Sequence, residues 1–313
     1  MISNQTKKLL VLKKLKGVGH ATLETISKVE GFELKSVEEI VESVPKLKKI
    51  LINKDALSEA EEKAHIDINE SEKNNSKIIS ILDDEYPAIL RGTYDKPIIL
   101  YISGQMPKLP SVAIIGTREP TTHGEEITRR ISKYFCDNGW SVVSGLALGC
   151  DSIAHKATID NNGHTTAVLA HGLHTIAPKQ NKKLADEILS TGGTLLSEYE
   201  FGADPMPYQF AARDRIQAGL SQGVIMIQSD IGGGSLIASR SAIKYGRTLG
   251  VPNPTELDKR GKEKKIEANL MLVGNEDSVK QKLLNCSPFE MQNLFVINNR
   301  DDYHSLLKKM SVY

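Results

Sequence analysis

Residues 112–151 read VAIIGTREPTTHGEEITRRISKYFCDNGWSVVSGLALGCD, and this stretch decides the fold. A short apolar run at 112–115 ends in a glycine and precedes a helical segment over about 124–138. The next apolar run, at 141–143, ends in Ser-Gly and precedes a second helical segment. Short apolar strands that alternate with helices are typical of βαβ units, which build a parallel sheet with helices on both faces.

The same alternation continues to residue 251. Further apolar runs occur at 166–170, 194–197, 224–227 and 248–251, and helical segments are expected near 151–161, 181–189, 211–220 and 235–245. Two strand-like runs, 78–82 and 98–102, precede the stretch. The sequence therefore predicts an α/β fold, an extended Rossmann-like domain over residues 76–284.

The flanking segments have a different character. Residues 1–75 carry apolar residues at helical spacing and predict a small helical domain. Its polar end, 58–77, is interpreted as a frayed helix end and linker, and residues 285–313 as a C-terminal tail. The turn at 15–23 resembles a helix-hairpin-helix turn, whose amides can hold a phosphate; a structural or partner-docking role is the alternative.

Composition excludes several classes of protein. Over 313 residues, 40 Lys and Arg balance 39 Asp and Glu, so nucleic acid would have to bind a local patch. The three cysteines lie far apart, which fits neither a disulfide framework nor a zinc site and suits a reducing cytoplasm. No apolar run approaches 18 residues, and the first residues do not form a secretion signal, so we expect a cytoplasmic protein with no membrane contact.

Phosphate-compatible loops follow successive predicted strands. Open α/β sheets bind ligands at the carboxyl ends of their strands, and glycine turns there present backbone N–H groups to anions. The candidate phosphate-loop residues are Gly116, Thr117, Ser144, Gly145, Gly234 and Ser235. Neither a dinucleotide fingerprint nor a Walker loop occurs, so no cofactor is expected.

Basic residues accompany three of these loops. The candidate anion-binding residues on these loops are Arg118, Lys179, Lys182, Arg213 and Arg215. Positive charge at the start of a helix opposes the helix dipole, and an anionic partner would offset that cost. A solvated face is the alternative for the lysines, and Tyr208 and Phe210 are either base-stacking platforms or core residues.

No catalytic constellation emerges from the sequence. Asp151 and His155 stand four residues apart on a predicted helix, but two ligands without a third are weak grounds for a metal. We interpret Asp151 as a helix N-cap, His155 as packed against the sheet, and Cys150 as a small packed residue. We therefore expect a protein that is not an enzyme and holds no metal.

Ordered markers give the chain a resemblance to a known family. They are Asp84-Glu-Tyr-Pro-Ala-Ile-Leu90, Ile114-Ile-Gly-Thr-Arg118, Ser144-Gly-Leu-Ala-Leu-Gly-Cys-Asp151, Pro178-Lys-Gln-Asn-Lys182, Phe210-Ala-Ala-Arg-Asp-Arg-Ile216 and Gly234-Ser-Leu236. With these markers the chain resembles the DNA-processing protein A family (DprA, also called Smf) from Ile81 to about Leu283.

The resemblance implies a single-stranded DNA binding protein that protects incoming strands, forms a homodimer and helps to load the RecA recombinase during transformation. It also implies that Arg118, Lys179 or Lys182, Arg213 and Arg215 contact the strand, which makes them the candidate DNA-binding residues. For residues 1–75 it implies a small SAM-like bundle. The chain departs from the family pattern at Leu148, Asp214 and Gly233, each of which makes the pocket less positive, and we expect no C-terminal winged helix.

A second hypothesis comes from a different class. The same Rossmann-like pocket suits a nucleotide-ligand sensor or hydrolase, in a mobile-element or phage-defence context, and the reduced positive charge favours this hypothesis slightly. Glu198 is the candidate carboxylate for such a hydrolase, although it belongs to the ordinary family pattern.

Overall fold

The computed structural model describes residues 2–45, 47 and 54–311, which fall into two compact units. Unit 1 comprises residues 1–103, 171–174 and 196–204, and unit 2 comprises residues 104–170, 175–195 and 205–313. The compact units thus divide after Ser103, whereas the domain boundary expected from the sequence lies after residue 75. Two short later segments return to unit 1, and their contacts are long-range features that a change of composition does not mark.

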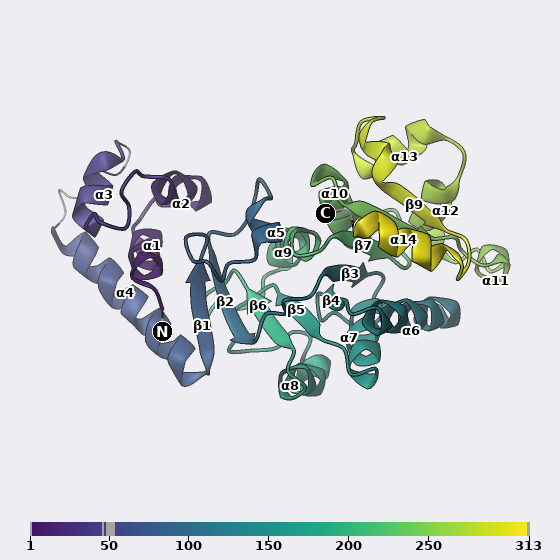
Figure 1. Cartoon of the computed structure of the whole chain (residues 1–313), viewed down its shortest axis with the longest axis horizontal. Helices are drawn as coiled ribbons and strands as arrows, with labels where there is room; N and C mark the ends of the chain where they lie inside the picture. The colour runs from purple at the N-terminus through teal and green to yellow at the C-terminus, as the bar shows by residue number, and fades with distance from the viewer. Residues whose placement is uncertain (1, 46, 48–53, 312–313) are drawn as a thin grey trace. The chain divides into compact units, whose positions relative to one another are not determined.

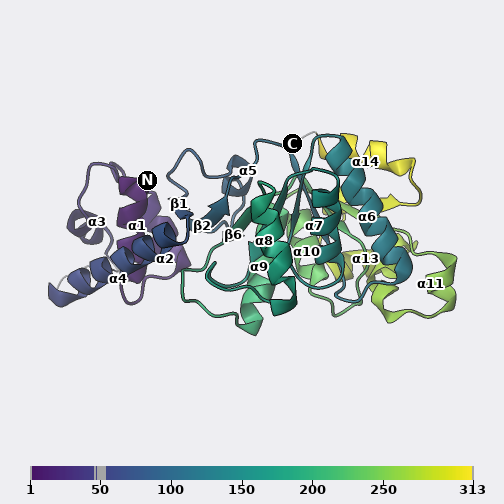
Figure 2. The same cartoon turned by 90° about the horizontal axis from the view of Figure 1, so that it is seen from below.

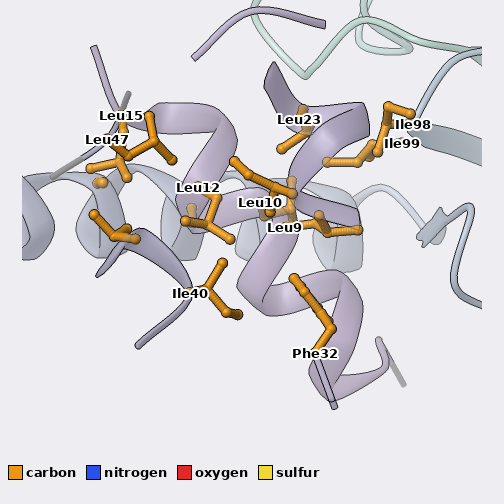
Figure 3. Packing of buried hydrophobic residues seen from close by; sticks show 14 of the residues in the cluster. Leu9, Leu10, Leu12, Leu15, Leu23, Phe32, Ile40, Leu47, Ile98 and Ile99 are labelled. Atoms are coloured by element: carbon orange, nitrogen blue, oxygen red, sulfur yellow. The ribbon is translucent and has the colours of Figure 1, made fainter. Parts of the chain in front are cut away.

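Unit 1 is built on helices that surround one apolar cluster. They are α1 (Asn4–Lys14), α2 (His20–Ser27), α3 (Val37–Ser43) and α4 (Lys54–Lys73). Leu9, Leu10 and Leu12 of α1 are fully buried and meet Ile40 of α3 at the centre of the cluster (Figure 3). The predicted small helical domain is therefore present, with a core that is almost entirely aliphatic.

Helix α4 replaces the linker expected at 58–77. That expectation was wrong because the segment has few large apolar residues, and α4 does not need them. Ala60 and Ala64 are buried, so the backbone of α4 can approach α1 closely. Asp67, also buried, pairs with Lys14 of α1 at 2.6 Å.

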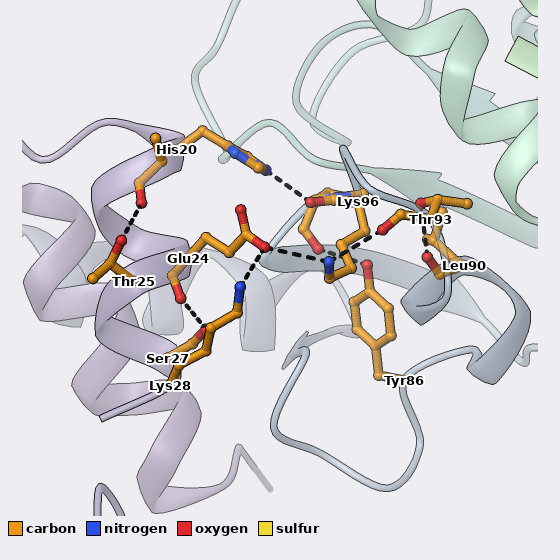
Figure 4. A network of polar contacts seen from close by, with 11 residues as sticks. His20, Glu24, Thr25, Ser27, Lys28, Tyr86, Leu90, Thr93 and Lys96 are labelled. Carbon is orange, nitrogen blue, oxygen red and sulfur yellow. Dashed lines mark hydrogen bonds and ion pairs between the residues drawn. The ribbon is translucent and has the colours of Figure 1, made fainter. Parts of the chain in front are cut away.

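A two-stranded ribbon completes the described part of unit 1. Strand β1 (Ser76–Ser80) pairs antiparallel with β2 (Ile99–Gly104), and the short helix α5 (Ala88–Arg91) lies between them in the chain. The network in Figure 4 ties this ribbon to α2: His20 contacts the Lys96 carbonyl at 2.7 Å, and Lys96 Nζ lies 3.4 Å from Glu24. Ile98 and Ile99 extend the aliphatic cluster from the same loop.

Unit 2 contains the predicted parallel sheet, except that residues 196–197 at the end of its strand β6 are assigned to unit 1. The strand order is β6-β5-β4-β3-β7-β8-β9. Parallel ladders join β3 to β4, β4 to β5, β3 to β7, β7 to β8 and β8 to β9. The strands are β3 (Ser111–Ile115), β4 (Ser141–Ser144), β5 (Thr165–Leu169), β6 (Thr194–Ser197), β7 (Gly223–Met226), β8 (Thr248–Pro252) and β9 (Leu294–Ile297).

Helices cover both faces of this sheet. On one face lie α6 (Thr122–Asp137), α7 (Cys150–Asp160) and α8 (Lys182–Ser190), and on the other lie α9 (Pro207–Gly219) and α10 (Ser235–Lys244) (Figures 1 and 2). The remaining helices are α11 (Glu256–Arg260), α12 (Glu267–Val273), α13 (Asp277–Leu284) and α14 (Asp302–Met310). The predicted extended Rossmann-like fold is confirmed.

The segment interpreted as a C-terminal tail is part of this sheet. Strand β9 extends the sheet beside β8, and α14 buries Tyr303, Leu306 and Met310. Met310 fits against Gly223, where a Cβ atom would stand 2.4 Å from its Cε atom. A segment too short to form its own core can still complete the core of its neighbours, and residues 285–311 do so.

Among the helices that the structure describes, none combines the length and the apolar character that crossing a membrane requires.

Candidate functional site

The topology of unit 2 marks one place for a ligand. From β3 the chain proceeds through β4, β5 and β6 on one side, and then returns to β7 and β8 on the other. Ligands of open α/β sheets bind beyond the carboxyl ends of the strands where the direction reverses. A cavity of about 570 Å³ lies there, lined by the loops after β3, β4 and β7, by α9 and α10, and by Lys265. We call it the switch-point cavity.

The loop after β3 supplies Gly116, Thr117 and Arg118, three of the candidate residues, to the lining of this cavity. Gly116 allows Cys150 to approach, because a Cβ atom there would stand 2.5 Å from the Cys150 Sγ atom. Arg118 is exposed at the cavity wall. Thr121 caps α6 by accepting a hydrogen bond from the Gly124 N–H at 3.1 Å, which confirms the predicted helix start.

The loop after β4 is closed by its own hydrogen bonds. The buried Ser144 hydroxyl donates to the Ile114 carbonyl at 2.6 Å. The N–H groups of Gly145 and Ala147 donate to Asp151 Oδ2 at 3.1 and 3.3 Å. Asp151 therefore closes this loop, and the helix N-cap predicted at Asp151 is wrong: Gly149 occupies that position. Ser144 and Gly145 shape the loop with polar groups that already have partners.

Arg213 lies in the floor of the cavity rather than on its surface. Its side chain is 4% exposed, and Nη1 donates to the Val168 carbonyl at 3.0 Å. The guanidinium lies against the backbone of Gly145, where a Cβ atom would stand 1.5 Å from Nη1. Arg213 can act on a ligand through its fixed charge. Arg215 is half-buried, donates from Nη1 to the Ala212 carbonyl at 2.6 Å, and is outside the described cavity lining.

The loop after β7 places Gly234 and Ser235, two further candidate residues, in the lining of the cavity. Its turn is held by Asp230, whose Oδ1 accepts a hydrogen bond from the Gly232 N–H at 2.8 Å. Gly233 packs against Ser229, and a Cβ atom there would stand 2.4 Å from the serine Oγ atom. The absence of a Cβ atom at position 233 therefore allows the loop to pass close to Ser229.

Lys179 and Lys182 are absent from the described lining of the switch-point cavity. Both are exposed, on the 3₁₀ turn η2 (Lys179–Asn181) and at the start of α8. Asn181 fixes this turn by donating to the Leu146 carbonyl at 2.8 Å. Pro178 lines a smaller cavity of about 130 Å³ that shares Arg118 and Arg213 with the switch-point cavity. Phe210 lines both cavities.

The sequence reasoning missed Lys265. This residue lines the cavity from η3 (Lys264–Ile266) and pairs with Glu119 at 2.9 Å. It belongs to a strongly charged stretch that is indistinguishable by sequence from an ordinary solvated face. In the described cavity lining, the charged side chains are then three bases and four acids: Arg118, Arg213, Lys265, Glu119, Asp151, Asp214 and Asp230.

Burial raises the pKa of two of these acidic groups, Asp214 and Asp151. Desolvation raises the pKa of Asp214 to about 7, against the opposing effect of the Arg213 charge. Desolvation also raises the pKa of Asp151, which Arg213 and the two loop amides oppose. The cavity therefore carries less negative charge near neutral pH than its acidic residues suggest.

His155 is a packed core residue, as predicted. It is fully buried, and its Nδ1 atom lies 2.7 Å from the Thr165 hydroxyl of β5. Burial lowers the pKa of His155 to about 3. Asp151 instead accepts hydrogen bonds from loop amides, so Asp151 and His155 have no common partner. In the described residues no group of three His, Cys, Asp or Glu side chains has the arrangement of a metal site.

Comparison with known proteins agrees with this architecture. The sequence profile of the DNA recombination-mediator protein A family matches residues 77–284. The DNA processing protein DprA of Bacillus subtilis is 39% identical over 174 residues, 55% of this chain and 58% of the relative. The protein of that name from Streptococcus pneumoniae is 41% identical over 172 residues, 54% of this chain and 60% of the relative. The matched part is thus less than two thirds of these relatives.

Two solved structures are similar as well. DNA processing protein A from Helicobacter pylori, solved for its single-stranded DNA binding mode, is 30% identical, with a TM-score of 0.60 over 74% of this chain and 96% of that one. DprA from Streptococcus pneumoniae is 28% identical, with a TM-score of 0.68 over 88% of this chain and 100% of that one. With the profile match and the shared fold, the chain belongs to the DNA recombination-mediator protein A (DprA/Smf) family.

Proposed function

We propose that the switch-point cavity and its rim bind the phosphates of single-stranded DNA. The observation that carries the proposal is the convergence of Arg118 with the glycine loops after β3 and β7 at the topological switch point. Backbone amides and an exposed guanidinium are donors suited to phosphate oxygens. The single-stranded DNA binding described for the Helicobacter pylori relative supports the same assignment.

In this proposal the basic residues have different roles. Arg118 contacts a phosphate directly, and the buried Arg213 adds a fixed charge below it. Lys179, Lys182 and Arg215 contact neighbouring phosphates along the rim. The exposed Tyr208 and the half-buried Phe210 supply faces on which bases stack, a contact that tolerates any base sequence.

We further propose that the protein is not an enzyme and acts in the cytoplasm through partners. The proposed role is protection of incoming strands and loading of a RecA-type recombinase by a homodimer. Co-precipitation with RecA and a mass measurement in solution test these two points. ATP hydrolysis or DNA cleavage that persists through further purification and is lost on Asp151→Asn would contradict the non-enzymatic assignment.

The second candidate function is a nucleotide sensor or hydrolase that uses the same cavity. The observation that favours it is the mixed charge of the cavity: four acids face three bases in the described lining, and burial raises the pKa of two of those acids, Asp151 and Asp214. The catalytic carboxylate suggested for it, Glu198, belongs to unit 1, whereas the described residues of the cavity lining all belong to unit 2. A compact ligand would fill the cavity without reaching the rim lysines.

Salt dependence and length dependence separate the two functions. Each phosphate contact to a single strand contributes about −0.7 to the slope of log K against log salt, so three to five contacts give roughly −2 to −3.5. Arg118→Ala should weaken oligo(dT) binding and reduce the slope by about one contact. Arg130→Ala is the matched control, since Arg130 is an exposed α6 arginine paired with Glu126. Equal affinity for a dinucleotide and a 20-mer, or no effect of Arg118→Ala, would contradict strand binding.

A further inference from the structure

The segment that carries Lys265 is fixed to the sheet. Ile266 is buried, and the Ala268 N–H donates to the Ser229 carbonyl at 3.0 Å. Asn269 Oδ1 accepts from the Ser229 N–H at 3.0 Å, and its Nδ2 donates to the Ile227 carbonyl at 2.8 Å. These contacts hold the segment at the end of β7. Lys265 is therefore carried to the cavity by a segment whose backbone is bonded to the end of β7, and not by a long unattached loop.

Lys265 meets Glu119 across the cavity wall. Their charged atoms are 2.9 Å apart, and the side chains are 32% and 79% exposed. The lysine lowers the pKa of Glu119, so this carboxylate is ionised at neutral pH. An exposed pair of this kind changes an equilibrium constant by about fivefold or less. A phosphate, which offers several acceptor oxygens in place of one carboxylate, can displace Glu119 at small cost.

The other charges of the cavity explain why the displacement of Glu119 would strengthen the binding of a phosphate. Arg213 is buried and already donates to the Val168 carbonyl, which leaves Arg118 and Lys265 as the more accessible bases of the described lining. Glu119 is adjacent to Arg118 in the chain and sets a negative charge beside both of these bases. While Glu119 is bound to Lys265, it occupies an ammonium group that could donate to a phosphate, and its negative charge also repels an anionic ligand.

We propose that Lys265 is a further phosphate-contacting residue of this cavity and that Glu119 is its intramolecular competitor, which a DNA phosphate replaces. The inference rests on the proposed strand binding at the same site. It adds a specificity element to that site. Ligands that bring a phosphate to Lys265 release Glu119, whereas uncharged ligands leave the Lys265–Glu119 ion pair intact.

Four proteins test the exchange: the parent, Glu119→Gln, Lys265→Gln and the double variant. The probe is a fluorescein-labelled oligo(dT) 20-mer, titrated at several salt concentrations. We expect Glu119→Gln to bind about 2- to 5-fold more tightly than the parent, the size of one exposed ion pair. In the Glu119→Gln background, Lys265→Gln should weaken binding by a similar factor and reduce the magnitude of the salt slope by about 0.7.

The chain offers a close control for loss of one lysine charge. Lys259 pairs with Glu256 at 2.9 Å, with exposures of 33% and 74%, and lies outside the described cavity linings. Lys259→Gln should leave both affinity and salt slope unchanged. Melting temperatures of all variants show whether each protein is folded.

One comparison separates the proposal from a merely structural ion pair. If Lys265 only neutralises Glu119, then Lys265→Gln weakens binding in the parent and has no effect in the Glu119→Gln background. That result would overturn the role of Lys265 while leaving strand binding intact. Absence of oligo(dT) binding by the folded parent would overturn the proposed function itself, and this inference with it.

Discussion

At the residue scale, Asp214 carries the pH dependence of the cavity. Its carboxyl lies beside Arg213, 3.4 Å from that residue's Nε, and accepts a hydrogen bond from Gln217 Nε2 at 2.8 Å. Asp151 and Arg118 also act on it electrostatically. Burial raises its pKa from the usual 3.8 to about 7, so the folded protein holds a proton that the unfolded chain releases. Stability is therefore lost as pH rises from about 4 to about 7, and the loss is constant above.

Asp214→Asn removes this titration while keeping the shape and an acceptor for Gln217. We expect the melting temperature of the variant, relative to the parent, to rise steadily from pH 5 to 7 and to level off above. The difference at pH 8 should correspond to a few kcal/mol at most, on the order of 1.4 kcal/mol per pKa unit. Oligo(dT) binding by the parent should also weaken over this range more than binding by the variant. A melting difference independent of pH would contradict the assignment.

At the element scale, the attachment of α4 to α1 depends on one buried charge. Asp67 bonds to Lys14 at 2.6 Å and accepts from the Tyr101 hydroxyl at 3.2 Å, and Glu200 also contacts Lys14 at 2.8 Å. Burial raises the pKa of Asp67, and the Lys14 ammonium opposes that shift. The Asp67 carboxylate therefore stays ionised, and stabilises the contact between α4 and α1, only while Lys14 faces it.

Removing one partner of a buried pair leaves an uncompensated charge, at a cost of about 3–5 kcal/mol. We expect Asp67→Ala to lower the free energy of unfolding by about 3 kcal/mol, the lower end of this range, because Glu200 still pairs with Lys14. Urea denaturation measures the change, and Glu70→Gln is the control from the same helix, since Glu70 pairs with Lys73 at an exposed position. Equal stability of the two variants would show that α4 is held by its alanines alone.

At the scale of the whole molecule, unit 1 does not separate at residue 75. Ile78, Ile98, Ile99 and Tyr101 belong to the same apolar cluster as the leucines of α1. Figure 3 shows Ile98 and Ile99 beside these leucines. A chain that starts at Lys77 should expose this surface, and we expect it to aggregate or to melt well below the full-length protein. Light scattering and thermal denaturation check this. A soluble, equally stable chain from residue 77 would support the sequence-based boundary instead.

The local sequence determined strands β3 to β8 of unit 2 and the edge of the sheet at which the candidate site lies, but it did not identify β9 or α14. Short apolar runs at regular intervals specify buried parallel strands, because side chains of such strands are covered on both faces. The glycine and threonine residues after these runs specify where strands end, so Gly116, Thr117, Arg118, Gly234 and Ser235 could be assigned to one edge of the sheet before any contact was known.

Only the tertiary structure decided what each charged residue does there. Arg213 looks like a surface arginine in sequence and is buried against Gly145, while Asp151 closes a loop rather than capping a helix. Lys265 reaches Glu119 from a segment far along the chain. Burial, and pairing between residues distant in sequence, set the charge and the reach of these groups. Neither quantity is encoded in the local pattern of residues, because both depend on which other elements pack against them.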